Sequence, residues 1–229
     1  MIDVVVWWSA PLAAEERFLG LLDETEQGRY DAYRQELDKR RFLTGRVLAK
    51  SLAAERLGKT AAEITFDSTC DDCGKPHGRP RVPGADLMLS ISHSGELIGV
   101  AATDGTPVGL DVETAKRRAD SSLIEYALSP AEQDALKGLT DDERATAFFT
   151  YWTRKEAVMK ATGKGLKIPL QSITFSPYNE QAVLLVSGDA ALDPASTRLT
   201  DLKAAEGYRA AVAVLSSDTL SATELPWSP

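Results

Sequence analysis

Two acidic residues, Asp111 and Glu113, lie two positions apart in the run Gly109-Leu110-Asp111-Val112-Glu113. Since successive side chains of a β-strand point to opposite faces, both carboxylates would lie on one face, while Leu110 and Val112 point into a core. Carboxylates held side by side repel each other, and Mg²⁺ commonly binds through one or two such groups. The pair is therefore a candidate Mg²⁺ site; the alternative is an exposed strand end with two solvated acids.

A second candidate pair, Glu156 and Lys160, lies in the segment Trp152-Thr153-Arg154-Lys155-Glu156-Ala157-Val158-Met159-Lys160. Residues four apart share one face of a helix, and a surface pair at this spacing stabilises a helix by only about 0.2–0.5 kcal/mol. An ordinary surface pair is one interpretation. In the functional interpretation, Glu156 is a third metal carboxylate or a general base, and Lys160 is a cation for a phosphate leaving group.

A histidine, His93, ends a strand-like run with hydroxyls on both sides, Ser90-Ile91-Ser92-His93-Ser94. Such a histidine can donate a hydrogen bond to a phosphate oxygen, although a lone histidine is more often structural. The preceding loop contains Cys70, Cys73 and His77. With His93 these residues could form a Cys₂His₂ zinc site, and the alternative is a turn-rich loop with reduced thiols.

The elements that must position these residues follow from periodicity and turn residues. Helical spacing of apolar residues extends over 12–57 with Gly58 as a stop, and a second long helix runs from Asp141 to Gly163. Ser129-Pro130-Ala131-Glu132 has the form of a capping box that starts another helix. The strand-like runs are 87–92, 97–103 and 107–113, expected to form an antiparallel meander, and 172–175, 182–186 and 208–215.

Helices and a small sheet recur in both parts of the chain, with a seam near residues 104–107. This recurrence predicts an α+β protein with two halves, 1–105 and 106–216, each a small sheet packed with helices. Residues 217–229 show no periodicity, so we expect a flexible tail there.

The charge balance excludes one class of function. Asp and Glu number 34 against 26 Lys and Arg, which gives a formal net charge of −8. A protein that binds nucleic acid through its overall field is basic, so any anionic ligand of this chain needs a local site. No apolar run approaches the ~20 residues that span a bilayer, and the N-terminus lacks the features of a signal peptide. We therefore expect a cytoplasmic protein that binds neither nucleic acid nor membrane.

Taken in order, three motifs resemble the 4′-phosphopantetheinyl transferases of the surfactin-synthetase type. The motifs are Ser90-Ile91-Ser92-His93-Ser94, Val108-Gly109-Leu110-Asp111-Val112-Glu113, and the segment 152–160 followed by Gly163-Lys164-Gly165. The resemblance covers about residues 40–175 and implies two pseudo-symmetric α/β halves with coenzyme A in the cleft between them. It also implies a monomeric enzyme of the holo-[acyl-carrier-protein] synthase type.

The resemblance implies roles for individual residues. Asp111, Glu113 and Glu156 would bind Mg²⁺, or Mn²⁺ in its place. Glu156, Lys160 and Asp111 would be catalytic, with Lys160 at the pyrophosphate. The residues implied to contact coenzyme A, as a co-substrate, are Arg41, Arg79, Pro80, Ser92, His93, Lys155, Lys160 and Lys164.

A Gly-Lys-Pro motif that the family carries before the histidine has two matches in this chain, Gly74-Lys75-Pro76 and Gly78-Arg79-Pro80. Spacing to Ser92 favours the second match, which makes Arg79 rather than Lys75 the expected ligand. Arg41 resembles the family's arginine for the 3′-phosphate of coenzyme A.

The reaction that the resemblance implies is transfer of the 4′-phosphopantetheine arm of coenzyme A to a serine of an apo acyl- or peptidyl-carrier protein. Adenosine 3′,5′-bisphosphate is released, and the carriers serve polyketide or nonribosomal peptide biosynthesis. Two other interpretations suit the same residues: a Mg²⁺-dependent nucleotide pyrophosphohydrolase, and a non-catalytic module that binds coenzyme A or a carrier protein. Lys116, Arg117 and Arg118, beside the apolar segment 121–128, are expected to dock an acidic carrier.

Overall fold

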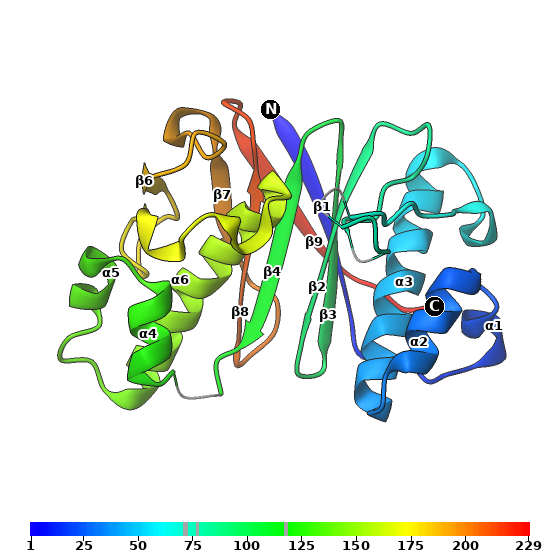
Figure 1. Ribbon diagram of the computed structural model, residues 1–229, viewed down its shortest axis with the longest axis horizontal. Coiled ribbons are helices and arrows are strands. Elements are labelled where there is room, and N and C mark those ends of the chain that lie inside the picture. Colours follow the sequence, from blue (N-terminus) through cyan, green and yellow to red (C-terminus); the bar gives the residue numbers. More distant parts are fainter. Residues whose placement is uncertain (71–72, 77, 117–118) are drawn as a thin grey trace.

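The computed structural model describes residues 1–70, 73–76, 78–116 and 119–229. Figure 1 shows two sheets at the centre, helices α1 to α3 on one side and helices α4 to α6 on the other. This arrangement confirms the α+β class, with a sheet and its own helices in each half. His77, Arg117 and Arg118, which the sequence assigned to a zinc site or a docking surface, lie outside the described residues.

The first sheet has the strand order β2-β3-β1-β9, in which β1 pairs antiparallel with β3 and parallel with β9. Helix α3 covers its outer face, and apolar side chains such as Leu48 and Leu52 pack there against Leu89 and Ile98. The elements of this half are β1 (Ile2–Ser9), α1 (Glu16–Leu19), α2 (Glu24–Ala32), α3 (Glu36–Leu57), β2 (Leu87–Ser94) and β3 (Leu97–Asp104).

The second sheet has the order β4-β8-β7, and α6 covers its outer face. A two-stranded antiparallel sheet, β5-β6, adjoins it. The elements of this half are β4 (Val108–Thr114), α4 (Ser121–Ala127), α5 (Pro130–Ala135), α6 (Asp141–Thr162), β5 (Ile173–Phe175), β6 (Leu184–Ser187), β7 (Arg198–Leu202) and β8 (Tyr208–Val214). Strand β9 (Leu220–Pro226) follows them in the chain and belongs to the first sheet. The 3₁₀ turns are η1 (Ala61–Glu63), η2 (Gly165–Lys167), η3 (Leu170–Ser172) and η4 (Pro194–Ser196).

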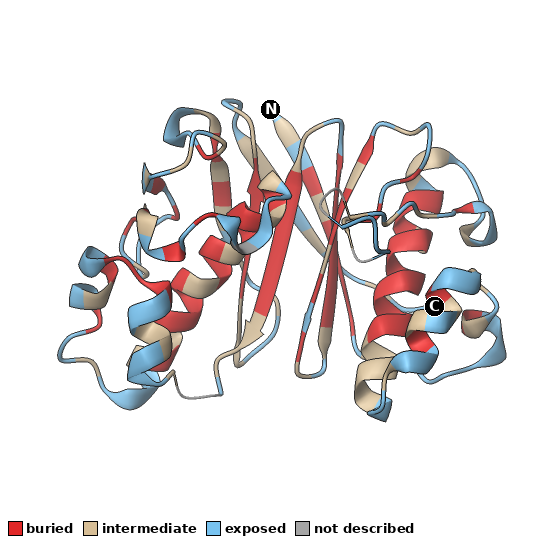
Figure 2. Cartoon of the chain, viewed as in Figure 1, coloured by how far each residue is buried: buried red, intermediate tan, exposed pale blue. Residues whose placement is uncertain are grey.

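Buried residues concentrate where these layers meet. One core lies between α3 and the first sheet, a second lies between the two sheets, and a third lies between the second sheet and α6. Figure 2 shows buried residues along both long helices and along the central strands. Among the described residues, none of the helices combines the length and the apolar character needed to cross a bilayer.

The predicted C-terminal ends of the two long helices are confirmed, although the helical segment predicted over 12–57 divides into α1, α2 and α3. Gly58 ends α3 with φ 63°, and Gly163 ends α6 with φ 71°, a left-handed backbone that glycine adopts without the steric cost of a Cβ. At the start of α5 the Glu132 carboxylate accepts a hydrogen bond from the Ser129 amide, which is one of the two bonds of the expected capping box. Local sequence therefore determines where these helices begin and end.

The predicted antiparallel meander is correct for β2 and β3 and wrong for β4. Strand β4 pairs antiparallel with β8, so the turn after β3 carries the chain from the first sheet to the second. Leu110 and Val112 then point into the core between the sheets, where they join Val4 and Val6 of β1. Alternation in the sequence indicates the strand, but the partner depends on which sheet covers its apolar face.

The flexible tail expected at 217–229 is also wrong, because its middle forms β9 along the edge of β1. Leu220 and Ala222 pack against the core between the sheets, and the Glu224 carboxylate accepts a hydrogen bond from the indole of Trp8 at 2.9 Å. Only two apolar side chains alternate inward, so the segment lacks the strong hydrophobic pattern that marks the other strands.

Helix α6 approaches β4 most closely at Gly109. A Cβ placed there would lie 2.0 Å from the Ala157 carbonyl oxygen and 2.4 Å from the Ala161 nitrogen, which are both backbone atoms of α6. No side chain can occupy that space unless the helix moves. The glycine of the Gly109–Glu113 run therefore sets the distance between α6 and the strand that carries the acids.

We expect Gly109→Ala to lower the free energy of unfolding by about 3 kcal/mol, because overpacking forces α6 away from β4. The matched control is Gly28→Ala in α2, where a Cβ meets no atom within 4 Å. The control should raise the free energy of unfolding by about 0.5–1 kcal/mol, since alanine restricts the unfolded chain and favours helix. Urea denaturation measures both variants, and equal stabilities would contradict this account of the glycine.

Candidate functional site

The site begins at the free edge of β4, where serine hydroxyls replace a neighbouring strand. Alternate residues of β2 place three buried serines against this edge, and each accepts a hydrogen bond from a β4 amide. Unpaired backbone donors at a buried edge are costly, and these hydroxyls satisfy them. The pairs are Leu110 N to Ser90 Oγ (2.9 Å), Val112 N to Ser92 Oγ (3.2 Å) and Thr114 N to Ser94 Oγ (3.2 Å).

Two of the three serines also hold the acidic side chains of β4. Ser92 Oγ donates to Asp111 Oδ1 at 3.0 Å, and Ser94 Oγ donates to Glu113 Oε2 at 2.7 Å. The other carboxylate oxygen, Asp111 Oδ2, is buried and has no hydrogen-bond partner among the described residues. An ionised carboxylate oxygen in that position is satisfied best by a cation.

Lys160 supplies one positive charge to these acids from the last turn of α6. Its ammonium group donates to Asp111 Oδ1 at 2.7 Å, to Ser92 Oγ at 3.0 Å and to the Leu110 carbonyl at 3.0 Å. These three acceptors use all three donors of the ammonium group. Lys160 therefore connects α6, β2 and β4 at one point.

Glu156 lies one turn before Lys160 and completes an acidic group with Asp111 and Glu113. Burial raises the pKa of Glu156, and the charges of Asp111 and Glu113 raise it further, against the opposing effect of Lys160. Burial likewise raises the pKa of Asp111, opposed by Lys160 and Ser92. The structure therefore brings the three predicted acids into electrostatic contact. Within the described parts of the chain, no set of three His, Cys, Asp or Glu side chains has the arrangement of a ready metal site.

A pocket of about 510 Å³ opens beside this group, between the N-terminal half and the end of α6. Lys160 lines the pocket and also forms an ion pair with Asp111 of the acidic group. Five of the residues predicted to contact coenzyme A line the pocket: Arg79, Pro80, His93, Lys160 and Lys164.

Arg79 closes one side of the pocket by joining the two halves. Its guanidinium donates to the carbonyl of Lys160 and, at 2.9 Å, to the carbonyl of Ala161. The carbonyls at a helix C-terminus carry partial negative charge and lack partners within the helix, so a guanidinium is stabilised there. Lys164, just beyond the helix, pairs with Asp189 at 2.9 Å.

Arg41 lies behind His93 rather than on the pocket wall. Its guanidinium donates to the Gly95 carbonyl at 2.7 Å and to Asp38 at 2.9 Å. Partial burial lowers the pKa of His93, and the positive charges of Arg41 and Lys160 lower it further. The imidazole is therefore held neutral near pH 7, where it can donate one hydrogen bond.

Besides Arg41, two further side chains predicted to contact coenzyme A do not line the pocket. Ser92 accepts from Val112 N and Lys160 and donates to Asp111, so its bonding capacity is used inside the junction. Lys155 is fully buried and pairs with Glu132 at 2.8 Å, while its ammonium also donates to the carbonyls of Leu170 and Ile173. In this structure both side chains are bonded within the protein, outside the pocket.

Arg46, which the sequence analysis did not single out, is buried and lines the pocket. Burial lowers the pKa of Arg46, and its Nη1 atom has no hydrogen-bond partner among the described residues. Arg29 lines the same wall, and both guanidinium groups lie over the ring of Phe42. The burial of Arg46 could have been predicted from its position in the sequence, between Phe42 and Val47 in a largely apolar stretch of α3.

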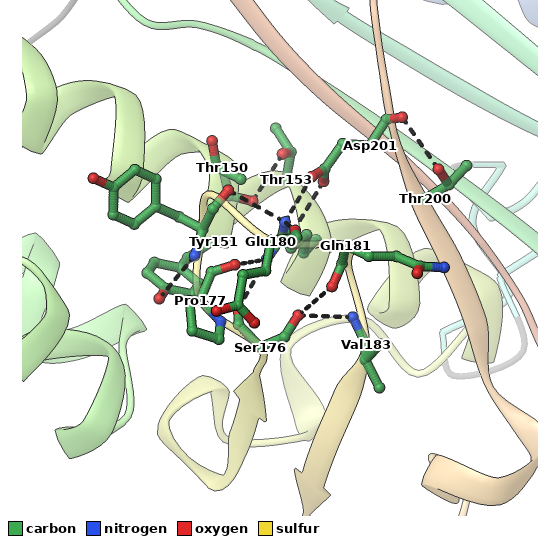
Figure 3. A network of polar contacts seen from close by, with 12 residues as sticks. Thr150, Tyr151, Thr153, Ser176, Pro177, Glu180, Gln181, Val183, Thr200 and Asp201 are labelled. Atoms are coloured by element: carbon green, nitrogen blue, oxygen red, sulfur yellow. Dashed lines mark hydrogen bonds and ion pairs between the residues drawn. The ribbon is translucent and has the colours of Figure 1, made fainter.

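Arg154 is a second residue that the sequence did not single out. Its fully buried guanidinium makes a bidentate pair with Asp201 (2.9 and 2.6 Å) and also donates to backbone carbonyls of the loop 176–180. Figure 3 labels its partners Asp201, Ser176 and Glu180. Consecutive residues of α6 thus engage three different structures: Arg154 binds β7 and the loop, Lys155 binds α5 and η3, and Glu156 faces the acids. Together they fix the rotation of α6 about its axis.

Comparison with known proteins gives matches along most of the chain. Residues 7–105 match a family model described as 4′-phosphopantetheinyl transferase, N-terminal, and residues 107–213 match the 4′-phosphopantetheinyl transferase superfamily. A 4′-phosphopantetheinyl transferase of Bacillus subtilis is 29% identical over 96% of this chain and 95% of its own. The transferase HetI of Nostoc is 32% identical over 76% of each chain. Thermotoga maritima holo-[acyl-carrier-protein] synthase, a solved structure, is 22% identical, with TM-score 0.40 over 49% of this chain and 64% of its own.

The buried Lys155–Glu132 pair predicts a stability effect without a ligand effect. Lys155→Met should lower the free energy of unfolding by about 3–5 kcal/mol, because Glu132 is left charged and buried without its partner. Adding Glu132→Gln removes that charge and should restore part of the loss. Chemical denaturation of the single and double variants measures this effect. An increase in KM for coenzyme A greater than twofold in the folded double variant would show that Lys155 contributes to binding of coenzyme A.

The electrostatic surroundings of His93 predict its titration. An NMR titration of the imidazole should give a pKa below the ordinary value of 6.5, so the ring is neutral at pH 7. Arg41→Gln removes a nearby positive charge and should raise the pKa of His93. The control, Arg40→Gln, alters an arginine bound to the carbonyls of Pro11 and Leu12 and should leave it unchanged. An equal response to both changes would contradict the assignment.

Proposed function

The chain belongs to the 4′-phosphopantetheinyl transferase superfamily, and from this premise we propose that it moves the phosphopantetheine arm of coenzyme A to a serine of an apo carrier protein. It is an enzyme of the phosphopantetheinyl transferase type, as the resemblance in its motifs indicated. One observation carries the proposal: Lys160 lines the pocket and is also bonded to Asp111. A pyrophosphate bound in the pocket therefore lies beside the acidic group.

The pocket suits a ligand with several phosphates. Among the described residues that line it there is no acid, although the protein as a whole carries a net charge of −8. Guanidinium groups bind phosphate oxygens in pairs, and lysines add point charges. We propose that these side chains bind the phosphates of coenzyme A. The positively charged residues of the lining are Arg29, Arg46, Arg79, Lys160 and Lys164.

The acidic group suits a divalent cation. Asp111 Oδ2 is buried without a partner, and Asp111 and Glu113 both raise the pKa of Glu156. Hard carboxylate oxygens are the ligands that Mg²⁺, and equally Mn²⁺, prefers. We propose that Asp111, Glu113 and Glu156 hold this ion, which would neutralise charge that develops on the pyrophosphate.

The remaining steps belong to side chains of this protein. Glu156 accepts the proton of the attacking serine hydroxyl, a contribution of about 10²–10⁴-fold. The serine oxygen attacks the phosphorus that carries the pantetheine arm, and the bond to the departing bisphosphate breaks. Lys160 stabilises the negative charge of adenosine 3′,5′-bisphosphate as it leaves.

The two halves divide this work in our proposal. Residues 1–105 contribute most of the pocket through α3, the loop before β2 and β2 itself, while residues 106–216 contribute the acids and Lys160. The carrier protein would dock on the C-terminal half, where α4 presents Tyr126 with 55% of its surface exposed. An aromatic ring of this kind is a common anchor in protein interfaces.

The test is mass spectrometry of purified apo carrier proteins mixed with the enzyme, coenzyme A and Mg²⁺. We expect a carrier to gain the mass of one phosphopantetheine group. Asp111→Asn keeps the shape of the side chain and should slow transfer at least about 100-fold, since a metal ligand loses its charge. Consumption of coenzyme A with no modified carrier would favour the pyrophosphohydrolase instead, and binding without reaction would favour the non-catalytic module.

A further inference from the structure

We infer that Ser94 is a positioning residue whose hydroxyl fixes the Glu113 carboxylate in the orientation that a divalent cation requires. The inference rests on the proposed function, because it takes Glu113 as a ligand of that cation. Ser94 belongs to β2, and the acid belongs to β4. The residue thus lies in one half of the protein and acts on a residue of the other.

The hydrogen-bond geometry determines what the hydroxyl can do. Ser94 is 8% exposed, accepts from Thr114 N at 3.2 Å and lies 2.7 Å from Glu113 Oε2. An ionised carboxylate can only accept, and a hydroxyl has a single proton. Since the amide of Thr114 occupies an acceptor position of the oxygen, the proton of Ser94 is directed at Glu113. One oxygen of the carboxylate is held in place by this bond.

The same unit occurs two residues earlier on both strands. Ser92 accepts from Val112 N and donates to Asp111. The repeat follows from strand geometry, because a step of two residues returns to the same side of each strand. Each acid of β4 therefore has its own serine on β2.

A third serine accepts a hydrogen bond from a β4 amide but has no carboxylate on that strand to which it can donate. Ser90 accepts from Leu110 N at 2.9 Å, but the position that corresponds to the acids is Gly109. Ser90 and Ser94 therefore make the same amide contact at the junction of the sheets and differ in the carboxylate contact; Ser90 also lines the pocket. This difference provides a matched control within the chain.

Fixing Glu113 matters because its side chain is only half-buried and has several rotatable bonds. A flexible carboxylate loses conformational entropy when it binds an ion, and a hydrogen bond that holds it beforehand reduces that loss. Groups that orient a ligating carboxylate typically change metal affinity by about 10–100-fold.

The experiment measures Mg²⁺ binding by calorimetry with no carrier, so that no turnover occurs, and with coenzyme A at a concentration that saturates each variant, because Ser90 lines the pocket. Ser94→Ala should weaken binding by about 10-fold or more, whereas Ser90→Ala should stay within about twofold of the parent. Urea denaturation of both variants shows whether their losses of stability are matched. Ser94→Thr keeps the hydroxyl and should restore affinity, and Ser94→Cys, a weaker donor of similar size, gives an intermediate loss if the alanine variant does not fold.

Equal weakening in Ser90→Ala and Ser94→Ala would overturn the inference, because the effect would then come from the junction alone. Parental affinity in Ser94→Ala would overturn it as well, and both results leave the proposed transfer reaction intact. If the parent protein binds no Mg²⁺ in the presence of coenzyme A, the proposed metal site is wrong, and the role of Ser94 fails with it.

Discussion

Hydrogen bonds from the β4 amides to serine side chains of β2 are the contact on which the arrangement of the site depends. In an ordinary sheet the acceptors along a strand edge are backbone carbonyls, which can accept but not donate. A hydroxyl in the same place satisfies the amide and still has a proton to give. That proton is directed at Asp111 by Ser92 and at Glu113 by Ser94. The junction of the halves and the orientation of the acids are thus one structure.

The acidic group and the positively charged pocket lie next to each other at this junction, and Lys160 connects them because it lines the pocket and pairs with Asp111. On one side are the acids of β4 and α6, and on the other is a pocket lined by guanidinium and ammonium groups. Helix α6 determines how close they come. Gly109 allows it to touch β4, Arg79 binds its last carbonyls, and Arg154 sets its rotation. Small changes in the position of this helix would therefore affect both groups at once.

Local patterns in the sequence were sufficient for features that depend on neighbouring residues. Gly58 and Gly163 mark helix ends, alternation places Asp111 and Glu113 on one face, and helical spacing brings Glu156 and Lys160 together. Recognition of the family also depended on such short motifs.

What sequence reasoning missed depends on contacts between distant segments. Lys155 is next to Glu156, yet its direction is set by Glu132, more than twenty residues earlier. The burial of Arg46 depends on Glu26 in another helix. Strand β9 has little pattern of its own and forms because β1 offers it an edge.

The position of β9 has a consequence for the order of events during synthesis. Strand β1 is synthesised well before its parallel neighbour β9, because the residues of the second sheet and its helices lie between them in the sequence. Until β9 is made, this edge of β1 carries unpaired backbone groups, and such edges promote association between nascent chains. The first sheet is therefore completed only after the segments that build the second sheet have been synthesised.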